Sequence, residues 1–522
     1  MPSLTAPPLV GLGVFFLWPV GTLVTRVVRP GSIADTLSLP GLGGVWWFTL
    51  WQAVCSTAAT MIVGLVPTHL LARRRFVGRR ILTALVTVPF MLPTVVVGAA
   101  FLALLPESWH GTGRAVVIAH VFFNIAVVVR LVGTLWAAIP DDLLEVAHTL
   151  GASHWRTFRH VTLPILRPAL WSAASVVFLF TFTAFGTVRL LGGRRHTTVE
   201  VEVARRATQL GDIDGAAVLS IAQLLVLALV AWASIRLQRR TTTSLQGAVV
   251  VRAPRDRRER AWVRGAATTT GALMIAPLLV LVARSFRIGD HWSTVAWRTL
   301  GRAEYRPGVG LGVDPWASLT TSLGVALVAT VVSVVVGTLA ALAIGTARRG
   351  ARWLDAALML PLATSAVTVG LGVLITFDRA PFDWRGEWWL VPIAHSLIAT
   401  PFVVRVLVSR LRAITPLQRD AAQVLGASPL RAWWSVEARR LATPIVGAAG
   451  LAAAISLGEF GASTFLTRTG RETLPLAIDR LLARAGDVPR AQAFALATIL
   501  LVATGTVAAI ADRRGALDAR RT

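Results

Sequence analysis

The chain alternates between long apolar runs and short polar segments. A transmembrane helix needs roughly 20 predominantly apolar residues, and twelve such runs are present, six on each side of an arginine-rich segment. They cover 8–28, 45–72, 81–105, 115–139, 165–187, 215–235, 265–284, 317–346, 354–377, 388–411, 442–466 and 491–511. The pattern predicts an all-α polytopic membrane protein of about twelve transmembrane helices. Pro89, Pro93 and Pro361 lie inside two of the runs, where we expect kinked or broken helices.

The two sets of six runs repeat one another in sequence. Counterparts stand 275 residues apart from about residue 118 to 216, and they include His120 with His395, Phe185-Gly186 with Phe460-Gly461 and Arg205 with Arg480. Because six is an even number of spans, both repeats have the same orientation and are related by an axis along the membrane normal. We therefore expect a first repeat over 1–240, a basic linker over 241–262 and a second repeat over 263–522, with a substrate pathway between the repeats.

Two polar segments are the clearest repeated feature, and we call 141–164 the first repeated loop and 415–441 the second. Their matching positions are Glu145 with Asp420, Ala147 with Ala422, Gly151 with Gly426, Ser153 with Ser428, Arg156 with Arg431, and Phe158 with Trp433. Each loop is typical of a helix, a tight turn and a second helix. Asp142 and Glu145 have the spacing of a capping box. The glycines suit a left-handed helix end, and the serines suit the N-cap of the next helix.

A single loop of this kind is equally well explained as an amphipathic connector that packs on its own bundle. Two copies, in the same register and on the same side of the membrane, favour a pair of contacts on a two-fold symmetric partner.

The arginine distribution predicts the orientation in the membrane. The loops 72–80 and 346–353 carry arginine and no acid, and the segment 236–264 holds nine arginines against Asp256 and Glu259. Since basic loops stay in the cytoplasm, both termini, the linker and both repeated loops are expected there. The more mixed segments 188–214 and 466–490 are then expected to face outward.

The composition agrees with a membrane protein and excludes several other classes. Hydrophobic residues make up 55% of the chain and the mean hydropathy is +0.66. The net charge of +26 comes from arginines between apolar runs, so nucleic acid is not an expected partner. No lysine is present, which rules out the lysine of a P-loop within this sequence. The single cysteine, Cys55, and the nine histidines show no metal-ligand spacing, and we expect neither a metal nor a cofactor.

Four polar residues inside the apolar runs are candidates for a substrate pathway. Glu459 lies within the run 442–466, where a carboxylate is costly and by default indicates function. Its counterpart is Ala184, so the pathway would be asymmetric. An alternative is that Glu459 lies near the outer end and reaches water. His120, His395 and Asn124 are candidates of lower rank, because hydrogen bonding between packed helices also explains them.

The repeated loops resemble a known family. The pattern acid-x-Ala-x-x-x-Gly, from Glu145 to Gly151 and from Asp420 to Gly426, followed by an aromatic at Phe158 or Trp433, is similar to the cytoplasmic "EAA" loop of binding-protein-dependent ABC-transporter permeases. Two copies in one chain resemble the fused permeases of thiamine and ferric-iron import systems. The second copy departs from the family after Trp433.

The resemblance implies a permease subunit in a bacterial plasma (inner) membrane. Two copies of a separate ATPase would bind the two loops, and an extracytoplasmic binding protein would deliver the substrate, thiamine or ferric iron. ATP would be hydrolysed by the partner chain, so this chain would not itself be an enzyme. The alternative is an ion-coupled secondary transporter with two parallel repeats. The two loops favour the first interpretation, and the scarcity of deep acids disfavours the second.

Overall fold

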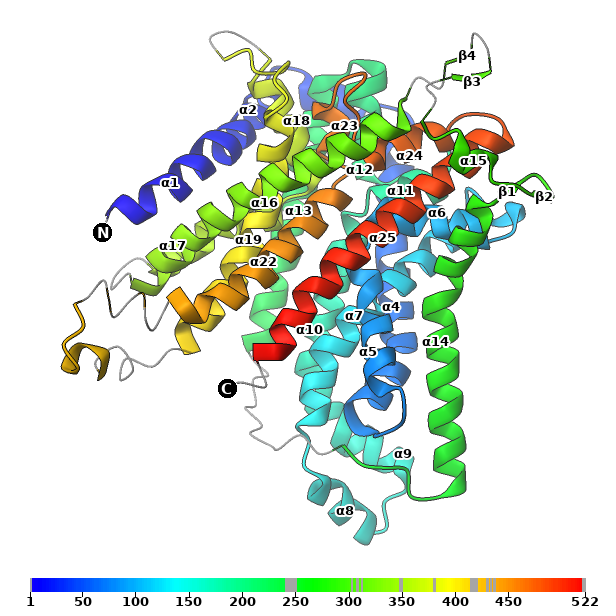
Figure 1. Cartoon of the computed structure of the whole chain (residues 1–522), viewed down its shortest axis with the longest axis vertical. Coiled ribbons are helices and arrows are strands. Elements are labelled where there is room, and N and C mark those ends of the chain that lie inside the picture. The colour runs from blue at the N-terminus through cyan, green and yellow to red at the C-terminus, as the bar shows by residue number, and fades with distance from the viewer. Residues whose placement is uncertain are drawn as a thin grey trace.

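The computed structural model describes residues 2–518 apart from 240–250, 302–303, 307–308, 311–312, 347–350, 379–381, 414–420, 429–430, 432–433 and 435–437. Its regular structure is almost entirely helical (Figure 1). The described strands form two short hairpins, β1 (Arg287–Ile288) with β2 (His291–Trp292), and β3 (Glu304–Arg306) with β4 (Val309–Gly310). The all-α fold class predicted from the sequence is confirmed.

The first half contains the following helices in chain order: α1 (Pro2–Leu12), η1 (Gly13–Leu17), α2 (Trp18–Val27), α3 (Ser32–Leu37), α4 (Leu42–Arg73), α5 (Arg79–Met91), α6 (Thr94–Leu104), η2 (Glu107–Trp109), α7 (Gly113–Ala137), α8 (Asp141–Thr149), α9 (His154–Thr157), η3 (Phe158–Thr162), α10 (Leu163–Phe182), α11 (Gly186–Leu191), α12 (Val199–Arg205), η4 (Arg206–Leu210) and α13 (Ile213–Arg239).

The second half repeats this order: α14 (Arg257–Ser285), α15 (Val295–Arg298), α16 (Pro315–Thr346), α17 (Ala351–Leu358), η5 (Leu360–Ala363), α18 (Ala366–Thr376), α19 (Leu390–Ala413), α22 (Arg439–Gly458), α23 (Ser463–Leu466), α24 (Leu474–Leu482) and α25 (Asp487–Asp518). Helix α14 begins at Arg257, inside the range predicted for the linker.

Ten helices among the described residues are long and apolar enough to cross a membrane, and they correspond to ten of the twelve predicted runs. The other two runs are broken where their prolines lie. The run 81–105 consists of α5 and α6, which meet at an angle of 108° next to Pro93. The run 354–377 consists of α17, a 3₁₀ turn that contains Pro361, and α18. Proline lacks the amide N–H and clashes with the preceding turn, which weakens a helix at such a point. Helix α5 continues through Pro89, and the break falls at Pro93. The expectation of broken helices in these two runs is therefore confirmed, and the other ten runs are continuous helices.

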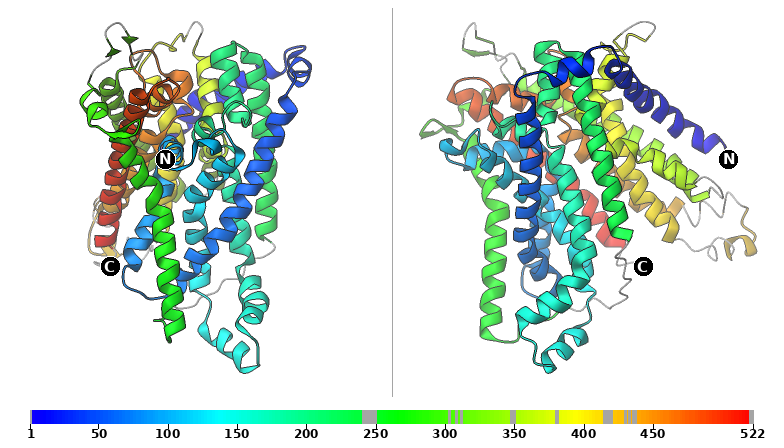
Figure 2. Two further views of the ribbon diagram at one scale, coloured as in Figure 1. Left: turned by 90° about the vertical axis from the view of Figure 1, so that its right-hand side faces the viewer. Right: turned by 180° about the vertical axis from the view of Figure 1, so that it is seen from behind.

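The same packing recurs in the two halves. Helices α4, α7 and α10 pack on one another in the first half, and α16, α19 and α22 do so in the second. The first helices are exchanged between the halves: α1 lies on α16 and α2 on α18, while α14 lies on α4, α5 and α6. Figures 1 and 2 show α1 beside the yellow-green helices and α14 beside the blue ones. The halves therefore interlock, each holding the first helix of the other.

The segments predicted as outward loops fold back into the protein. Within 188–214, α12 is almost entirely buried, and within 466–490 α24 buries most of its residues. These short helices, with α11 and α23, lie between the long helices near the end of the molecule opposite the repeated loops (Figure 1). Sequence polarity alone placed them at the surface, but their acids and arginines are paired inside, for example Glu202 with Arg206 at 2.9 Å.

The two halves meet at a pair of equivalent phenylalanines. Phe185 and Phe460 are counterparts in the repeat, and their ring centroids lie 4.9 Å apart. Because a residue here contacts its own counterpart, the axis that relates the halves passes close to these rings. The glycine that follows each ring packs on an equivalent position of its own half, Gly186 on Thr94 and Gly461 on Ala366.

Replacing Gly370 with Ala should destabilise the second half. A Cβ at this position would lie 2.7 Å from the backbone Cα of Ala462, which cannot move as a side chain end can. Overpacking of this kind costs about 1–3 kcal/mol, so the melting temperature of the purified protein should fall. Gly447→Ala, where nothing lies within 4 Å, is the control and should leave it unchanged. Equal melting temperatures for the two variants would contradict this packing.

Candidate functional site

The first repeated loop ends its first helix in a Schellman motif. Gly151 has φ +82°, its N–H donates to the carbonyl of His148 at 2.9 Å, and the N–H of Ala152 donates to the carbonyl of Ala147 at 3.0 Å. These two bonds define the motif, in which the left-handed position strongly favours glycine. The predicted capping box is absent, because α8 begins after Pro140 without a side-chain cap. Glu145 instead reaches the linker, as described below.

The second repeated loop ends its helix in the same way. Gly426 has φ +84°, its N–H donates to Gln423 at 2.9 Å, and the N–H of Ala427 donates to Ala422 at 3.0 Å. Every donor and acceptor lies 275 residues after its counterpart in the first loop. The alanines of the sequence pattern therefore supply the carbonyl that closes each turn, and a small side chain leaves room for the turn. Asp420 and Trp433 lie outside the described residues.

Both predicted serine caps are present. Ser153 Oγ accepts the N–H of Arg156 at 3.3 Å, and Ser428 Oγ accepts the N–H of Arg431 at 3.4 Å. In the first loop the chain continues through α9 and a π-helical turn directly into α10. Phe158 packs on Trp136 of α7 and stacks with Trp155, while the side chain of Arg156 is exposed. The first repeated loop is therefore continuous with α10 and packed on α7, so that its position is coupled to both helices.

The tips of the two loops expose equivalent leucines. Leu150 is 83% exposed and its counterpart Leu425 is 87% exposed. Each lies just before the left-handed glycine and outside the spans. Leu143, Val146 and Trp155 of the first loop and Val424 of the second are exposed as well. Several exposed apolar side chains on one polar loop are typical of a protein interface.

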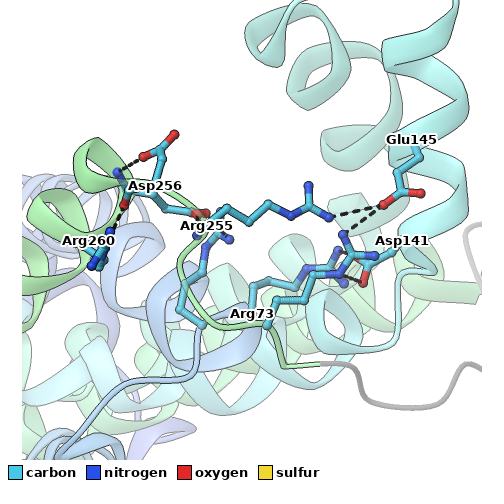
Figure 3. A network of polar contacts seen from close by, with 9 residues as sticks. Arg73, Asp141, Glu145, Arg255, Asp256 and Arg260 are labelled. Atoms are coloured by element: carbon cyan, nitrogen blue, oxygen red, sulfur yellow. Dashed lines mark hydrogen bonds and ion pairs between the residues drawn. The ribbon is translucent and has the colours of Figure 1, made fainter.

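The linker holds the first loop through a network of ion pairs (Figure 3). Arg252 lies between two acids of α8, with its Nε 2.6 Å from Asp141 and its Nη1 3.0 Å from Glu145. Arg255 adds a contact to Glu145 at 3.5 Å, and Arg73 at the end of α4 pairs with Asp141. Arg252 also pairs through its backbone, donating to Arg73 and accepting from Arg75.

The network favours the charged form of Glu145. The hydrogen bond from Arg252 and the charge of Arg252, followed by Arg255, hold the pKa of this carboxyl below its usual range. Its carboxylate is therefore ionised at neutral pH. The network lines a cavity of about 880 Å³ between α8, the linker and the C-terminal ends of α4 and α7.

Two predicted pathway residues, His120 and His395, are buried between helices. His395 has both ring nitrogens hydrogen-bonded, to Ser456 at 2.9 Å and to Ser463 at 3.0 Å. His120 contacts Ser56 at 3.3 Å through Nδ1 and leaves Nε2 without a partner. Asn124 donates to the carbonyl of His120 at 2.9 Å, and its amide oxygen is likewise without a partner.

Glu459 lies next to the contact between the halves. It directly precedes Phe460, and its carboxylate accepts the N–H of Ala462 at 2.8 Å in the turn between α22 and α23. It is 9% exposed, so it is largely buried in this conformation. A second buried acid, Glu200 of α12, is 1% exposed and was missed because the sequence placed it in an outward loop. The described residues contain no cluster of His, Cys, Asp and Glu that could hold a metal ion.

Comparison with known proteins supports the resemblance inferred from the repeated loops. Residues 60–243 match the family described as "Binding-protein-dependent transport system inner membrane component". The thiamine transport system permease protein ThiP of Salmonella typhimurium is 27% identical over 82% of this chain and 81% of its own length. ThiP of Brucella suis is 27% identical over 90% and 87%. A probable ABC transporter permease protein, y4fN of Sinorhizobium fredii, is 25% identical over 96% and 94%. The similarity therefore spans both halves.

Replacing Arg252 with Gln should loosen the first repeated loop alone. The variant removes the guanidinium that joins Asp141 and Glu145 but keeps the backbone pairing with α4. Partly exposed ion pairs of this kind change local opening by about fivefold. Amide hydrogen exchange over 141–152 should therefore accelerate by about this factor, with 421–428 as the internal control. Unchanged exchange in 141–152 would show that Arg252 does not hold the loop.

Proposed function

We propose that this chain, a permease of the binding-protein-dependent ABC-importer type, forms the transmembrane pathway of an ATP-driven importer of thiamine. A separate chain hydrolyses ATP, and an extracytoplasmic binding protein delivers the cargo. The chain spans a bacterial inner membrane many times. Both termini and the repeated loops face the cytoplasm, as the arginine distribution predicts.

The repeated loops dock two copies of the ATPase. The observation that carries this proposal is the exposed leucine at the tip of each loop, held by the same turn and the same serine cap 275 residues apart. A symmetric dimer offers two equal surfaces, so it requires two equal contacts. Glu145, Arg156 and Phe158 in the first loop, and Arg431 in the second, complete these contacts. Asp420 and Trp433 are proposed for the same role from the sequence pattern alone.

Thiamine is the proposed cargo because curated relatives named as thiamine permeases match both halves of this chain. Ferric iron, the other cargo implied by the loop pattern, has no comparable support. The metal would also find no preformed cluster of hard ligands in the described residues.

Transport proceeds by alternating access. Closure of the ATPase dimer would move both loops together, and the continuous path from α9 into α10 would transmit this motion to the helices as rigid bodies. The contact of Phe185 with Phe460 closes the pathway on the axis in the present conformation. Glu459 beside this contact is the main pathway residue. His120 and Asn124 each keep a buried polar atom free for a cargo, whereas the two bonds of His395 favour a packing role.

Proteoliposomes that contain the permease, its ATPase and its binding protein should accumulate thiamine only when ATP is supplied. Omitting the ATPase should abolish uptake, because this chain has no lysine for a P-loop of its own. The measurement is the uptake of radiolabelled thiamine, with ferric iron as the comparison cargo. Uptake driven by a proton or sodium gradient without ATP would favour a secondary transporter and overturn the proposal.

The double variant Gly151→Pro with Gly426→Pro should abolish uptake while the protein still inserts. Proline fixes φ near −65°, so neither loop can keep its turn. The N–H groups of Gly151 and Gly426, each of which forms one of the two bonds in its turn, are also lost. Uptake and co-purification of the ATPase are the measurements. The control is Gly41→Pro with Gly470→Pro, two glycines with φ of +85° and +83° at the opposite end of the molecule. The control should still bind the ATPase, and normal uptake in the first variant would refute docking through these turns.

A further inference from the structure

Two buried carboxylates, one from each half, lie at the contact between the halves without an internal counter-charge. Glu200 is 1% exposed and Glu459 is 9% exposed. Neither forms an ion pair with any arginine or histidine in the described part of the chain, although other buried acids do, such as Glu202 and Glu472. Ser365, which contacts Glu200, directly precedes Ala366, and Gly461, two residues after Glu459, packs on Ala366, so the two groups lie in one region. A buried acid without a cation is costly and needs an explanation.

Glu200 ties the two halves together through neutral donors. It accepts the amide N–H of Gln223, on α13 of its own half, at 2.7 Å. It also accepts the hydroxyl of Ser365, which caps α18 of the other half, at 2.9 Å. These bonds satisfy lone pairs but supply no positive charge. Glu200 and Ser365 therefore form a direct polar contact between the halves, which a separation of α12 from α18 would break.

The surroundings supply hydrogen-bond acceptors in excess of donors. The amide oxygen of Gln223 is buried and has no hydrogen-bond partner, although its nitrogen is bonded to Glu200. Glu459 is held by backbone N–H groups of residues 460–462 and by no cation. The aromatic rings of Phe460, which follows Glu459 in the chain, and of Phe185 are also electron-rich. Carboxylates, an amide oxygen and aromatic faces are together the groups that recognise an organic cation carrying N–H donors.

We propose that Glu200, Glu459 and Gln223, with the Phe185–Phe460 pair, form a cation-selective gate that the cargo crosses as the halves separate. The cargo is a positively charged organic molecule with hydrogen-bond donors, and it supplies the counter-charge that the protein lacks. This inference rests on the proposed function, since it assigns the cargo class of the same pathway. The gate is formed by the permease itself, so it adds a selectivity step after the delivery protein.

The first test compares Glu200→Gln, Glu459→Gln and the double variant in the complete complex of permease, ATPase and binding protein. Glutamine has the same shape, and at position 200 its oxygen can accept from Gln223 while its NH2 group donates to the hydroxyl oxygen of Ser365, so the fold should be retained. The rate of thiamine uptake should fall at least about tenfold in the double variant, since focusing of a cation by charge is lost. ATP hydrolysis should stay within about twofold of wild type, because the repeated loops are untouched. Glu459→Asp, which keeps the charge, should restore part of the uptake.

Glu107→Gln is the matched control, because Glu107 is an exposed acid at the same end of the molecule. It should leave uptake unchanged. Uptake equal to wild type in the double glutamine variant would overturn the gate. A wild-type complex that hydrolyses ATP but takes up no thiamine would instead overturn the proposed cargo, so the two failures are distinguishable.

A second test keeps both carboxylates and therefore does not depend on the glutamine variants folding. In a Cys55→Ser background, Ser365→Cys places a thiol beside Glu200. During ATP turnover, a trimethylammonium methanethiosulfonate should modify it about tenfold faster than a sulfonate methanethiosulfonate. Each rate is first divided by the rate of the same reagent with a free thiol in solution. Equal rates, a preference for the sulfonate, or no reaction during turnover would overturn the proposal.

Discussion

Inside a bilayer no water is available to satisfy a polar group, so every buried donor, acceptor and charge must find its partner within the protein. The arrangement of the helices depends on this constraint. Gln52 of α4 donates to the carbonyl of Thr181 at the end of α10, and His395 of α19 contacts Ser456 and Ser463. Each bond crosses between helices that are distant in sequence. Such bonds define the register in which apolar surfaces, which alone pack with little directional preference, come together.

The same constraint makes the unpaired acids at the axis informative. In this interior arginines partner neighbouring acids, as Arg206 does for Glu202 and Arg189 does for Asp479. Glu200 and Glu459 depart from this rule at the place where the two halves meet. Their counterparts in the repeat are Pro475 and Ala184, so the duplication has not been kept symmetric here. Under the proposed gate, a single cargo molecule would meet the two carboxylates at non-equivalent positions, so this site would not require equal halves.

At the opposite end the halves have remained alike. The turns at Gly151 and Gly426 share their hydrogen bonds, their serine caps and an exposed leucine. A partner made of two identical subunits requires this equality. One difference arises because the linker exists once. Arg252 holds Glu145 of the first loop, and the chain offers no second linker for the other loop. Under the proposed function, symmetry is kept where a symmetric ATPase would bind and is relaxed beside the single linker and at the proposed gate.

The sequence by itself determined the membrane class, the twelve apolar runs, the duplication and the turns of the repeated loops. These features depend on local chemistry, namely hydrophobic length, the freedom of Gly151 and Gly426 at positive φ, and the caps at Ser153 and Ser428. Only the tertiary structure decided that α12 and α24 fold inward, and that the first helices are exchanged between the halves.

Contacts between residues far apart in the chain account for what could not be predicted. Glu200 and Ser365 are separated by 165 residues, and Glu145 and Arg252 by 107. A segment with acids and arginines is typical of a solvated loop, and no local pattern says that its charges will pair with each other inside the bundle. The capping box at Asp142 failed for the same reason, since Glu145 gains more from a distant arginine than from the start of its own helix. Local chemistry specified the elements, and long-range electrostatics in a medium without water decided where the polar ones lie.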